Sequence, residues 1–351
     1  MAFAAISKPG LHMNTKLYTG DGSATQAITG VGFQPDWIWI KSRDATHDHY
    51  CFQSILANKY GLEPSDTSAE RTPALGSFNS DGFTFASTDG FYNTNSGTYV
   101  SWNWKAGGAT GSSNNDGSIA TTVTANTTAG FSIVKFNKSS LAANSTMGHG
   151  LGKVPKAIFF KNISNADSWY AYHEQLGGGA YLVPNDTNNA QTSTGFMNSS
   201  TAPTTSVFTQ TSTFWGTSNH DVLAFCFAEI KGYSKFGSYM NTGRADGPYC
   251  YTGFQPELVI IKSSDRNGSN WNLLDRKRPA RNRTDYRIKI TGSTEQTGSA
   301  NSIDILSTGF KIRGVDDDVN AAGAGDDYLY WAWAKNPFVA NVGESIPTTA
   351  F

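Results

Sequence analysis

Three short apolar runs lie far apart in the chain, and each closely follows a proline. The runs cover residues 37–40, 157–160 and 258–261, after Pro35, Pro155 and Pro256. Their length and their β-branched and aromatic residues favour buried strands over helices. A proline fits just before or at the start of a strand, because its missing N–H breaks no hydrogen bond of the sheet there. We therefore predict one buried strand after each proline.

Other segments alternate along the chain as half-buried strands do. Residues 99–104 and 328–333 alternate, and residues 131–136 and 286–290 predict further strands. Turn dipeptides such as Asp81-Gly82 and Asp116-Gly117 separate these segments. Many short strands with frequent turns predict an all-β protein of antiparallel, jelly-roll-like β-sandwiches. The one stretch with helical character, residues 54–59, is short.

Five landmarks occur three times in the same order. Each copy has the proline, a lysine six residues later, an aromatic eight or nine residues beyond it, a Gly-Phe pair and two aromatics two positions apart. The lysines are Lys41, Lys161 and Lys262; the aromatics beyond them are Tyr50, Trp169 and Trp271; the closing pairs are Trp102 and Trp104, Phe225 and Phe227, and Trp331 and Trp333. Such repetition indicates a scaffold. It also predicts that Trp39, Phe160 and Ile261 occupy equivalent buried strand positions.

The repeated unit is long enough to form a domain. The prolines are 120 and 101 residues apart, whereas solenoid and propeller repeats span about 20–50 residues. A unit of about 100 residues can bury a core of its own, so we predict three tandem homologous domains. The predicted limits are an N-terminal arm at 1–15, repeat 1 at 16–107, a linker at 108–128, repeat 2 at 129–231, repeat 3 at 232–338 and a tail at 339–351.

Composition narrows the class of protein. Charged residues make up 16% and aromatics 13% of the chain, which suits a β-rich protein and argues against disorder. The net charge of −1 gives no global attraction to nucleic acid or to an anionic membrane. No apolar run is long enough for a transmembrane helix, and the first residues lack the features of a signal peptide. Cys51, Cys226 and Cys250 are odd in number, which predicts free, mostly buried thiols made in a reducing cytoplasm.

The paired aromatics have two interpretations. Residues two apart in a strand point to the same face, so each pair forms either a sugar-stacking platform or part of the core. The second copy keeps the pattern with phenylalanines, which favours the core because hydrophobicity rather than ring chemistry is maintained. Sugar contact is then expected from loop aromatics, although packing under a loop is favoured for the two tryptophans among them. These aromatics are Tyr92, Trp169, Tyr170 and Trp271.

Charged clusters provide further candidate sites. A basic cluster suits phosphate-bearing polymers or an acidic partner, but a solvated loop partly paired with the third domain's acidic cluster is favoured. That acidic cluster offers the oxygen ligands that Ca²⁺ prefers, although a solvated loop is favoured because no EF-hand spacing is present. His47 and His49 lack a third ligand, which disfavours a metal site. The basic residues are Arg276, Lys277, Arg278, Arg281 and Arg283, and the acidic residues are Asp316, Asp317, Asp318, Asp326 and Asp327.

Sequence patterns of catalysis are missing. The chain has no nucleophile elbow, P-loop, His-Glu-x-x-His or Cys-x-x-Cys motif. No glutamate lies in a context that suggests the paired carboxylates of glycosidase chemistry. We therefore predict a protein that is not an enzyme and that needs no cofactor other than the calcium considered above.

Several motifs together resemble a known family. Residues 16–22, 32–43, 80–83, 99–108 and 127–134 are similar to the repeat-containing virion structural proteins, often labelled tail-fibre-like, of tailed phages that infect marine bacteria and cyanobacteria. The resemblance spans most of the chain and weakens in the third repeat. It implies a virion component that assembles with other virion proteins in the host cytoplasm. It supplies no catalytic or binding residues.

Three functions remain open. The first is a tail- or fibre-associated receptor-binding protein that attaches to host surface polysaccharide, and the second is a head or tail decoration (cement) protein. The third is a carbohydrate-active enzyme or lectin. Virion appendages are symmetric, so we expect a homo-oligomer, either a trimer or a ring, with no nucleic acid bound and no membrane insertion. The apolar contact between chains is expected from arm residues Phe3, Ile6 and Leu11.

Overall fold

Each apolar run that follows a proline forms a buried strand. The computed structural model describes residues 4–108, 110–216, 219–279 and 283–337. Strands β3 (Trp37–Ser42) and β20 (Phe254–Ser263) are buried at every position, and β12 (Pro155–Asn162) at every position except Lys156. Both faces are buried because alternate residues of each strand pack into two different hydrophobic clusters, one on either side of the sheet. The predicted buried strands are confirmed in all three places.

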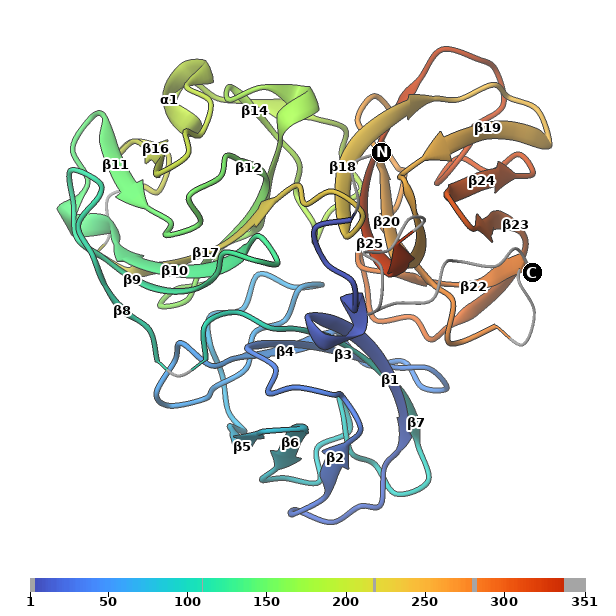
Figure 1. Cartoon of the computed structure of the whole chain (residues 1–351), viewed down its shortest axis with the longest axis horizontal. Helices are drawn as coiled ribbons and strands as arrows, with labels where there is room; N and C mark the ends of the chain where they lie inside the picture. Colours follow the sequence, from blue (N-terminus) through green and yellow to red (C-terminus); the bar gives the residue numbers. More distant parts are fainter. Residues whose placement is uncertain (1–3, 109, 217–218, 280–282, 338–351) are drawn as a thin grey trace.

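These strands occupy the same place in three antiparallel sheets. The strand orders are β1-β7-β3-β4, β10-β17-β12-β13 and β18-β25-β20-β21. The first unit (residues 13–104), second unit (112–228) and third unit (234–337) surround a common centre (Figure 1). The other strands of this shared order are β1 (Met13–Thr19), β4 (Tyr50–Gln53), β7 (Thr98–Trp104), β10 (Phe131–Asn137), β13 (Trp169–His173), β17 (Asp221–Ala228), β18 (Ser234–Met240), β21 (Asn272–Asp275) and β25 (Asp327–Pro337).

Strand pairing fixes which residues of the three units correspond. The pairs opposite one another are Trp39 with Trp102, Phe159 with Phe225, and Ile260 with Trp331. The prediction that Trp39 corresponds to Phe160 and Ile261 is therefore wrong by one residue. A shift of one residue along a strand reverses the face. Trp39 points to the inner face of its sheet, whereas Phe160 and Ile261 point to the outer face.

The sheets have an inner face shared by all units and an outer face that belongs to one. Ile40, Phe160 and Ile261 lie in three separate outer clusters. The inner faces join in one cluster, which contains all six paired aromatics. Rings of different units stack there, with centroids 4.5 Å apart for Trp37 and Phe225. The prediction that the paired aromatics fill the core is confirmed, and this core lies between the units.

Further strands either continue these sheets or pack on their outer faces, and they complete the predicted all-β fold. The first unit has β2 (Ala27–Thr29), β5 (Leu75–Asn79) and β6 (Gly82–Phe85); the second has β8 (Ser112–Asn114), β9 (Thr121–Asn126), β11 (Ser145–Gly148), β14 (Ala180–Tyr181), β15 (Gln191–Thr192) and β16 (Val207–Gln210); the third has β19 (Asp246–Tyr251), β22 (Arg283–Lys289), β23 (Thr297–Leu306) and β24 (Gly309–Arg313). The helices of the described residues are α1 (Met197–Ser200) and the 3-10 turns η1 (Pro9–Leu11), η2 (Lys138–Ser140) and η3 (Glu174–Leu176). None of them has the length and apolar character needed to cross a membrane.

The N-terminal segment packs on its own chain. The N–H of Ala5 donates to the carbonyl of Lys231 over 3.1 Å, and Ile6 belongs to the shared inner cluster. Ile6 therefore cannot supply the predicted contact between chains. Leu11 is exposed, whereas Phe3 and the tail at 339–351 lie outside the described residues. The three cysteines are buried and free, as predicted.

Candidate functional site

The units contact one another through backbone hydrogen bonds that repeat around a ring. The bonds run from the N–H of Glu70 to the carbonyl of Ile163 (3.0 Å), from Ala190 to Ser264 (2.8 Å), and from Gln296 to Arg43 (3.2 Å). They join the first unit to the second, the second to the third, and the third back to the first. In each case the acceptor lies two residues after the repeated lysine. The third bond closes the ring.

At each junction between units, the N–H group of an aromatic side chain donates a second repeated hydrogen bond. The bonds are Trp169 Nε1 to the carbonyl of Glu63 (2.9 Å), Trp271 Nε1 to Val183 (3.0 Å) and His49 Nε2 to Lys289 (2.9 Å). His49 Nδ1 accepts from Trp39 Nε1 over 2.8 Å, so Nε2 carries the proton. Burial, with the nearby charge of Lys41, lowers the pKa of His49 to about 3. His49 is thus neutral and takes the place that a tryptophan has in the other two units. It is not available to bind a metal together with His47. The residue that corresponds to Trp169 and Trp271 is His49 and not, as the sequence had predicted, Tyr50.

The repeated lysines are buried beside these contacts. Lys161 Nζ donates to the carbonyls of Thr67, over 2.9 Å, and Asp167. Lys262 Nζ donates to the carbonyls of Ser269, over 2.9 Å, and Thr187, over 3.3 Å. Burial lowers the pKa of all three lysines to about 8. Lys161 and Lys262 each tie a loop of the preceding unit to a loop of their own.

A buried ion pair adds a contact between the third unit and the first. Arg278 Nε donates to Asp275 Oδ2 over 2.6 Å, and both side chains are fully buried. The same carboxylate oxygen accepts from Trp102 Nε1 over 3.0 Å. The guanidinium of Arg278 lies 5.8 Å from the centroid of the Trp102 ring. Arg278, predicted as a surface contact for a partner, therefore holds the ring together instead.

The predicted glycan-contact aromatics are mostly inside the molecule. Tyr92 lies in the outer cluster of the first unit, and Trp169 and Trp271 lie in the shared inner cluster. A sugar cannot reach these three rings, so the prediction of sugar contact is wrong for Tyr92, whereas the packing role favoured for the two tryptophans is confirmed. Tyr170 is half-buried, and its hydroxyl donates to Asp167 over 2.8 Å.

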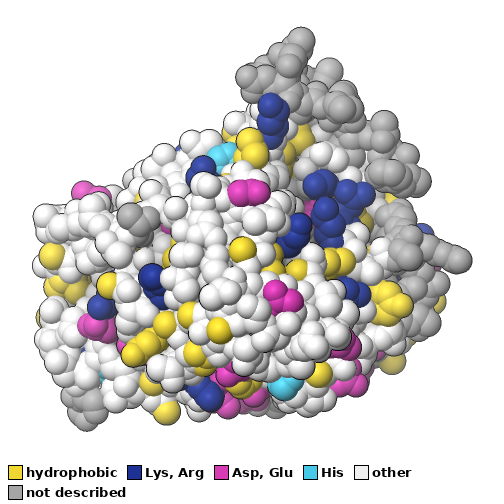
Figure 2. All heavy atoms as spheres, turned by 90° about the horizontal axis from the view of Figure 1, so that it is seen from below, with side chains coloured by type: hydrophobic (Ala, Val, Ile, Leu, Met, Phe, Trp, Pro, Cys, Tyr) yellow, Lys and Arg dark blue, Asp and Glu magenta, His cyan; other side chains and the backbone are white. Residues whose placement is uncertain are grey.

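The remaining basic residues lie near the surface. Lys277 is exposed and Arg276 is half-buried. Arg281 and the side chain of Arg283 lie outside the described residues. Figure 2 shows Lys and Arg side chains gathered at one place on the lower face of the molecule, whereas apolar side chains are scattered in small groups there. The molecule therefore has a basic surface, to which the buried Arg278 does not contribute.

The carboxylates of the predicted calcium site are paired with cations of the chain itself. The pairs are Arg287 with Asp316 (2.8 Å), Lys289 with Asp318 (3.3 Å), and Arg266 with Asp326 (2.9 Å) and Asp317 (3.4 Å). Asp327 is exposed. Within the described ranges, no group of three His, Cys, Asp or Glu side chains is arranged to hold a metal ion. The acidic loops are thus held by ion pairs, and the cations come from outside the basic cluster.

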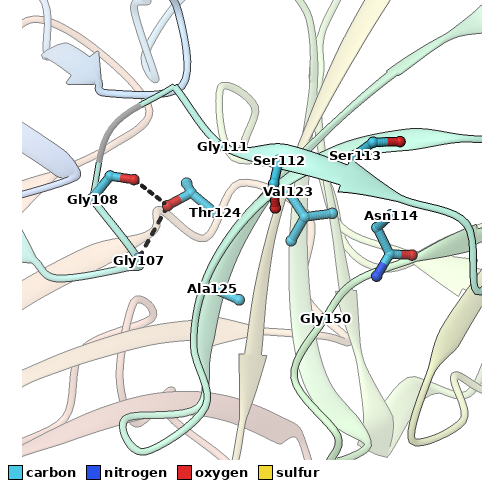
Figure 3. Close-up of a pocket in the computed structure, with 10 residues that line it drawn as sticks. All are labelled: Gly107, Gly108, Gly111, Ser112, Ser113, Asn114, Val123, Thr124, Ala125 and Gly150. Carbon is cyan, nitrogen blue, oxygen red and sulfur yellow. Dashed lines mark hydrogen bonds between the residues drawn. The ribbon is translucent and has the colours of Figure 1, made fainter.

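One groove lies where the first unit passes into the second. It has a volume of about 410 Å³ and is lined by Gly107, Gly108, Gly111, Ser112, Ser113, Asn114, Val123, Thr124, Ala125 and Gly150 (Figure 3). Thr124 Oγ1 accepts from the N–H of Gly107 and donates to the carbonyl of Gly108, both over 3.0 Å. A Cβ at Gly107 would approach the backbone nitrogen of Ala125 to 2.9 Å, so this wall requires glycine. None of these ten lining residues is charged, so the groove offers hydrogen-bonding groups without a carboxylate, lysine or histidine.

A short motif marks two of the contact loops and escaped the sequence prediction. Residues 64–67 read Pro-Ser-Asp-Thr and residues 184–187 read Pro-Asn-Asp-Thr. The carbonyls of Thr67 and Thr187 accept from the repeated lysines of the following unit. The third unit has no such motif at the corresponding place. Comparison of the first two repeats alone would have found this signal.

One family covers nearly the whole chain. Residues 8–337 match the family described as a domain of unknown function, DUF7483. The chain belongs to the DUF7483 family. The match extends from before β1 to the end of β25, so the DUF7483 domain comprises all three units. Comparisons of this DUF7483 protein with curated proteins and with solved structures give no match.

Proposed function

We propose that this DUF7483 protein is a non-enzymatic structural component of a bacteriophage particle, associated with the tail or its fibres, that attaches the particle to host surface glycans. The closed ring is the observation that carries the proposal, because three units share one aromatic core and keep separate outer faces. A repeated scaffold with divergent outer surfaces is typical of presentation. The resemblance of the repeated motifs to phage virion proteins supports the same assignment.

The use of the buried ionisable groups supports a role without catalysis. Lys161, His49 and Asp275 serve contacts between units. An active site requires unlike groups that converge in one accessible pocket. The groove at the junction of the first two units is lined by uncharged residues. We therefore expect the purified protein to bind host polysaccharide without releasing reducing ends, and release abolished by one Asp or Glu substitution would contradict this.

Location in the particle tests the assignment directly. Antibodies against the purified protein would be applied to intact phage particles, and the label located by electron microscopy. Label at the tail or fibres, together with retention of the protein on host cells, is the expected result. Particles that contain none of the protein would overturn the proposal.

A decoration protein is the second candidate, and the three-part ring favours it. Three similar units around a centre suit a three-fold position on a symmetric shell. In that case the label would cover the head or tail shell, and the protein would bind purified shells but not host cells.

A further inference from the structure

Exposed apolar side chains gather in the third unit, although the three units share one scaffold. The exposed large apolar residues of the described chain are Leu11, Met240, Tyr249, Tyr251, Tyr286 and Val315. All except Leu11 belong to the third unit. Because the shared scaffold does not require this difference, the outer surface of the third unit is the best candidate for contact with another molecule.

Two of these tyrosines lie side by side on one strand. Tyr249 and Tyr251 point outward from β19, with 44% and 60% of their surfaces exposed, while Cys250 between them points into the outer cluster. Residues two apart on a strand are separated by about 7 Å. The two rings therefore form a short aromatic row on the outside of the molecule.

The backbone keeps the outer ring of this row open. Tyr251 lies opposite Gly309 of β24, which has no side chain to cover it. A Cβ at Gly309 would approach the carbonyl oxygen of Cys250 to 2.0 Å, so no larger residue fits there. The next residue of β24 on this face, Lys311, lies opposite Tyr249. The strand partner of Tyr251 therefore contributes no side chain, and 60% of the Tyr251 surface is exposed.

Charged side chains that form ion pairs with one another lie next to the two tyrosines. Asp246 accepts from Lys311 over 3.0 Å and from Arg313 over 2.9 Å, yet 77% of its side chain is exposed. Hydrogen bonding by Lys311 lowers the pKa of Asp246, so the carboxylate stays ionised. Arg313 also binds Asp304 over 2.6 Å. Two carboxylates and two cations therefore balance, and the surface attracts neither polyanions nor polycations.

We propose that the outer face of β19 and β24 binds a neutral pyranose polysaccharide. The apolar C–H face of a sugar ring stacks on Tyr251 and Tyr249, and its hydroxyls donate to the exposed carboxylate of Asp246. Neighbouring sugars of one polymer contact the two tyrosines in turn. This inference rests on the proposed function and names its ligand class.

Binding to soluble polysaccharides tests the site. Mannan and galactomannan serve as neutral probes and alginate as an acidic one, with affinity electrophoresis and calorimetry as readouts. We expect retention by a neutral probe that high salt leaves unchanged, because no net charge is involved. Tyr251→Ala should weaken it about tenfold or more, which corresponds to about 1.4 kcal/mol. Tyr286→Ala, which removes an exposed tyrosine of β22 away from this row, should leave it unchanged.

A second variant and two other outcomes keep the test decisive. Asp246→Asn keeps the size of the side chain and should also weaken binding if the carboxylate receives hydroxyls. Equal binding by wild type and Tyr251→Ala, or salt-sensitive preference for alginate, would overturn the site. Self-association that Tyr251→Ala abolishes would also overturn it, since an exposed edge strand can pair with another chain. The proposed function is tested by a different experiment and is overturned if phage particles contain none of the protein.

Discussion

At the scale of single residues, Glu257 shows what the third unit has changed. It follows its proline directly, as Asp36 does in the first unit. Asp36 accepts backbone N–H groups of Ala106, over 2.7 Å, and Gly108, over 3.1 Å. Glu257 is buried, and neither of its carboxylate oxygens has a hydrogen-bond partner among the described residues. Burial raises its pKa, while Lys335 opposes this shift.

We predict that Glu257→Gln stabilises the protein at neutral and alkaline pH. A carboxyl whose pKa rises on folding stabilises the fold when protonated, and this contribution is lost as pH rises through the folded-state pKa. At about pH 8 the variant should therefore be more stable by about 1–3 kcal/mol, and the difference should shrink towards acid pH. Urea unfolding at several pH values measures it. Glu229→Gln, at an exposed residue paired with Lys235, is the control, and a less stable Glu257→Gln would contradict the argument.

Replacement of Lys161 is expected to lower the stability of the protein, whereas replacement of Glu257 raises it. Lys161→Met leaves the carbonyls of Thr67 and Asp167 without their donor, so stability should fall by about 1–3 kcal/mol. A lysine whose pKa is lowered by folding destabilises the fold while charged, and the cost is relieved between about 8 and 10.5. The stability of the wild type should therefore rise over this range, and that of the variant should rise less. Lys153→Met, which removes an exposed lysine bonded to the carbonyl of Thr127, is the control; equal pH profiles would count against the argument.

At the scale of elements, the sequence predicted the strands and missed the junctions between units. Apolar runs with β-branched and aromatic residues mark a strand buried on both faces, and a proline marks its start, so β3, β12 and β20 were predictable. The junctions use backbone carbonyls as acceptors, which have no side-chain signature. Their donors also differ in kind, because His49 replaces a tryptophan. The face was missed in two units because Phe160 and Ile261 lie five residues after their prolines, whereas Trp39 lies four residues after its own. A count of four from each proline leads to Phe159 and Ile260, which do correspond to Trp39.

Adjacent residues of β12 separate the two faces by experiment. Phe159 lies in the shared inner cluster and Phe160 in the outer cluster of the second unit. Truncation of either to alanine should destabilise the protein by about 3–5 kcal/mol. Hydrogen exchange should then distinguish them, since Phe159→Ala loosens all three units and Phe160→Ala mainly the second. Faster exchange confined to the second unit in both variants would show that the inner face is not a common core.

At the scale of the whole molecule, the three units form a ring within one chain, and the homo-oligomer expected from the sequence stays a separate prediction. The three units supply both sides of every repeated contact, and Ile6 fills the common core. Such a ring is complete without a second copy, so we expect the purified protein to sediment as a monomer of 37.8 kDa. Trimers at high protein concentration would instead support a contact between chains, for which Leu11 is exposed.

Cutting the chain tests whether the ring holds without its covalent links. Gly111 and Ser112 are exposed between the first two units, and exposed segments tolerate insertions. A protease site inserted there divides the chain into fragments that still share the inner aromatic core and the contacts of Trp169 and Asp275. We expect the cut protein to sediment as one particle in buffer and to separate into two fragments in urea. Separation in buffer would mean that the units are independent domains joined only by the chain, and the closed ring that supports the proposed function would not hold.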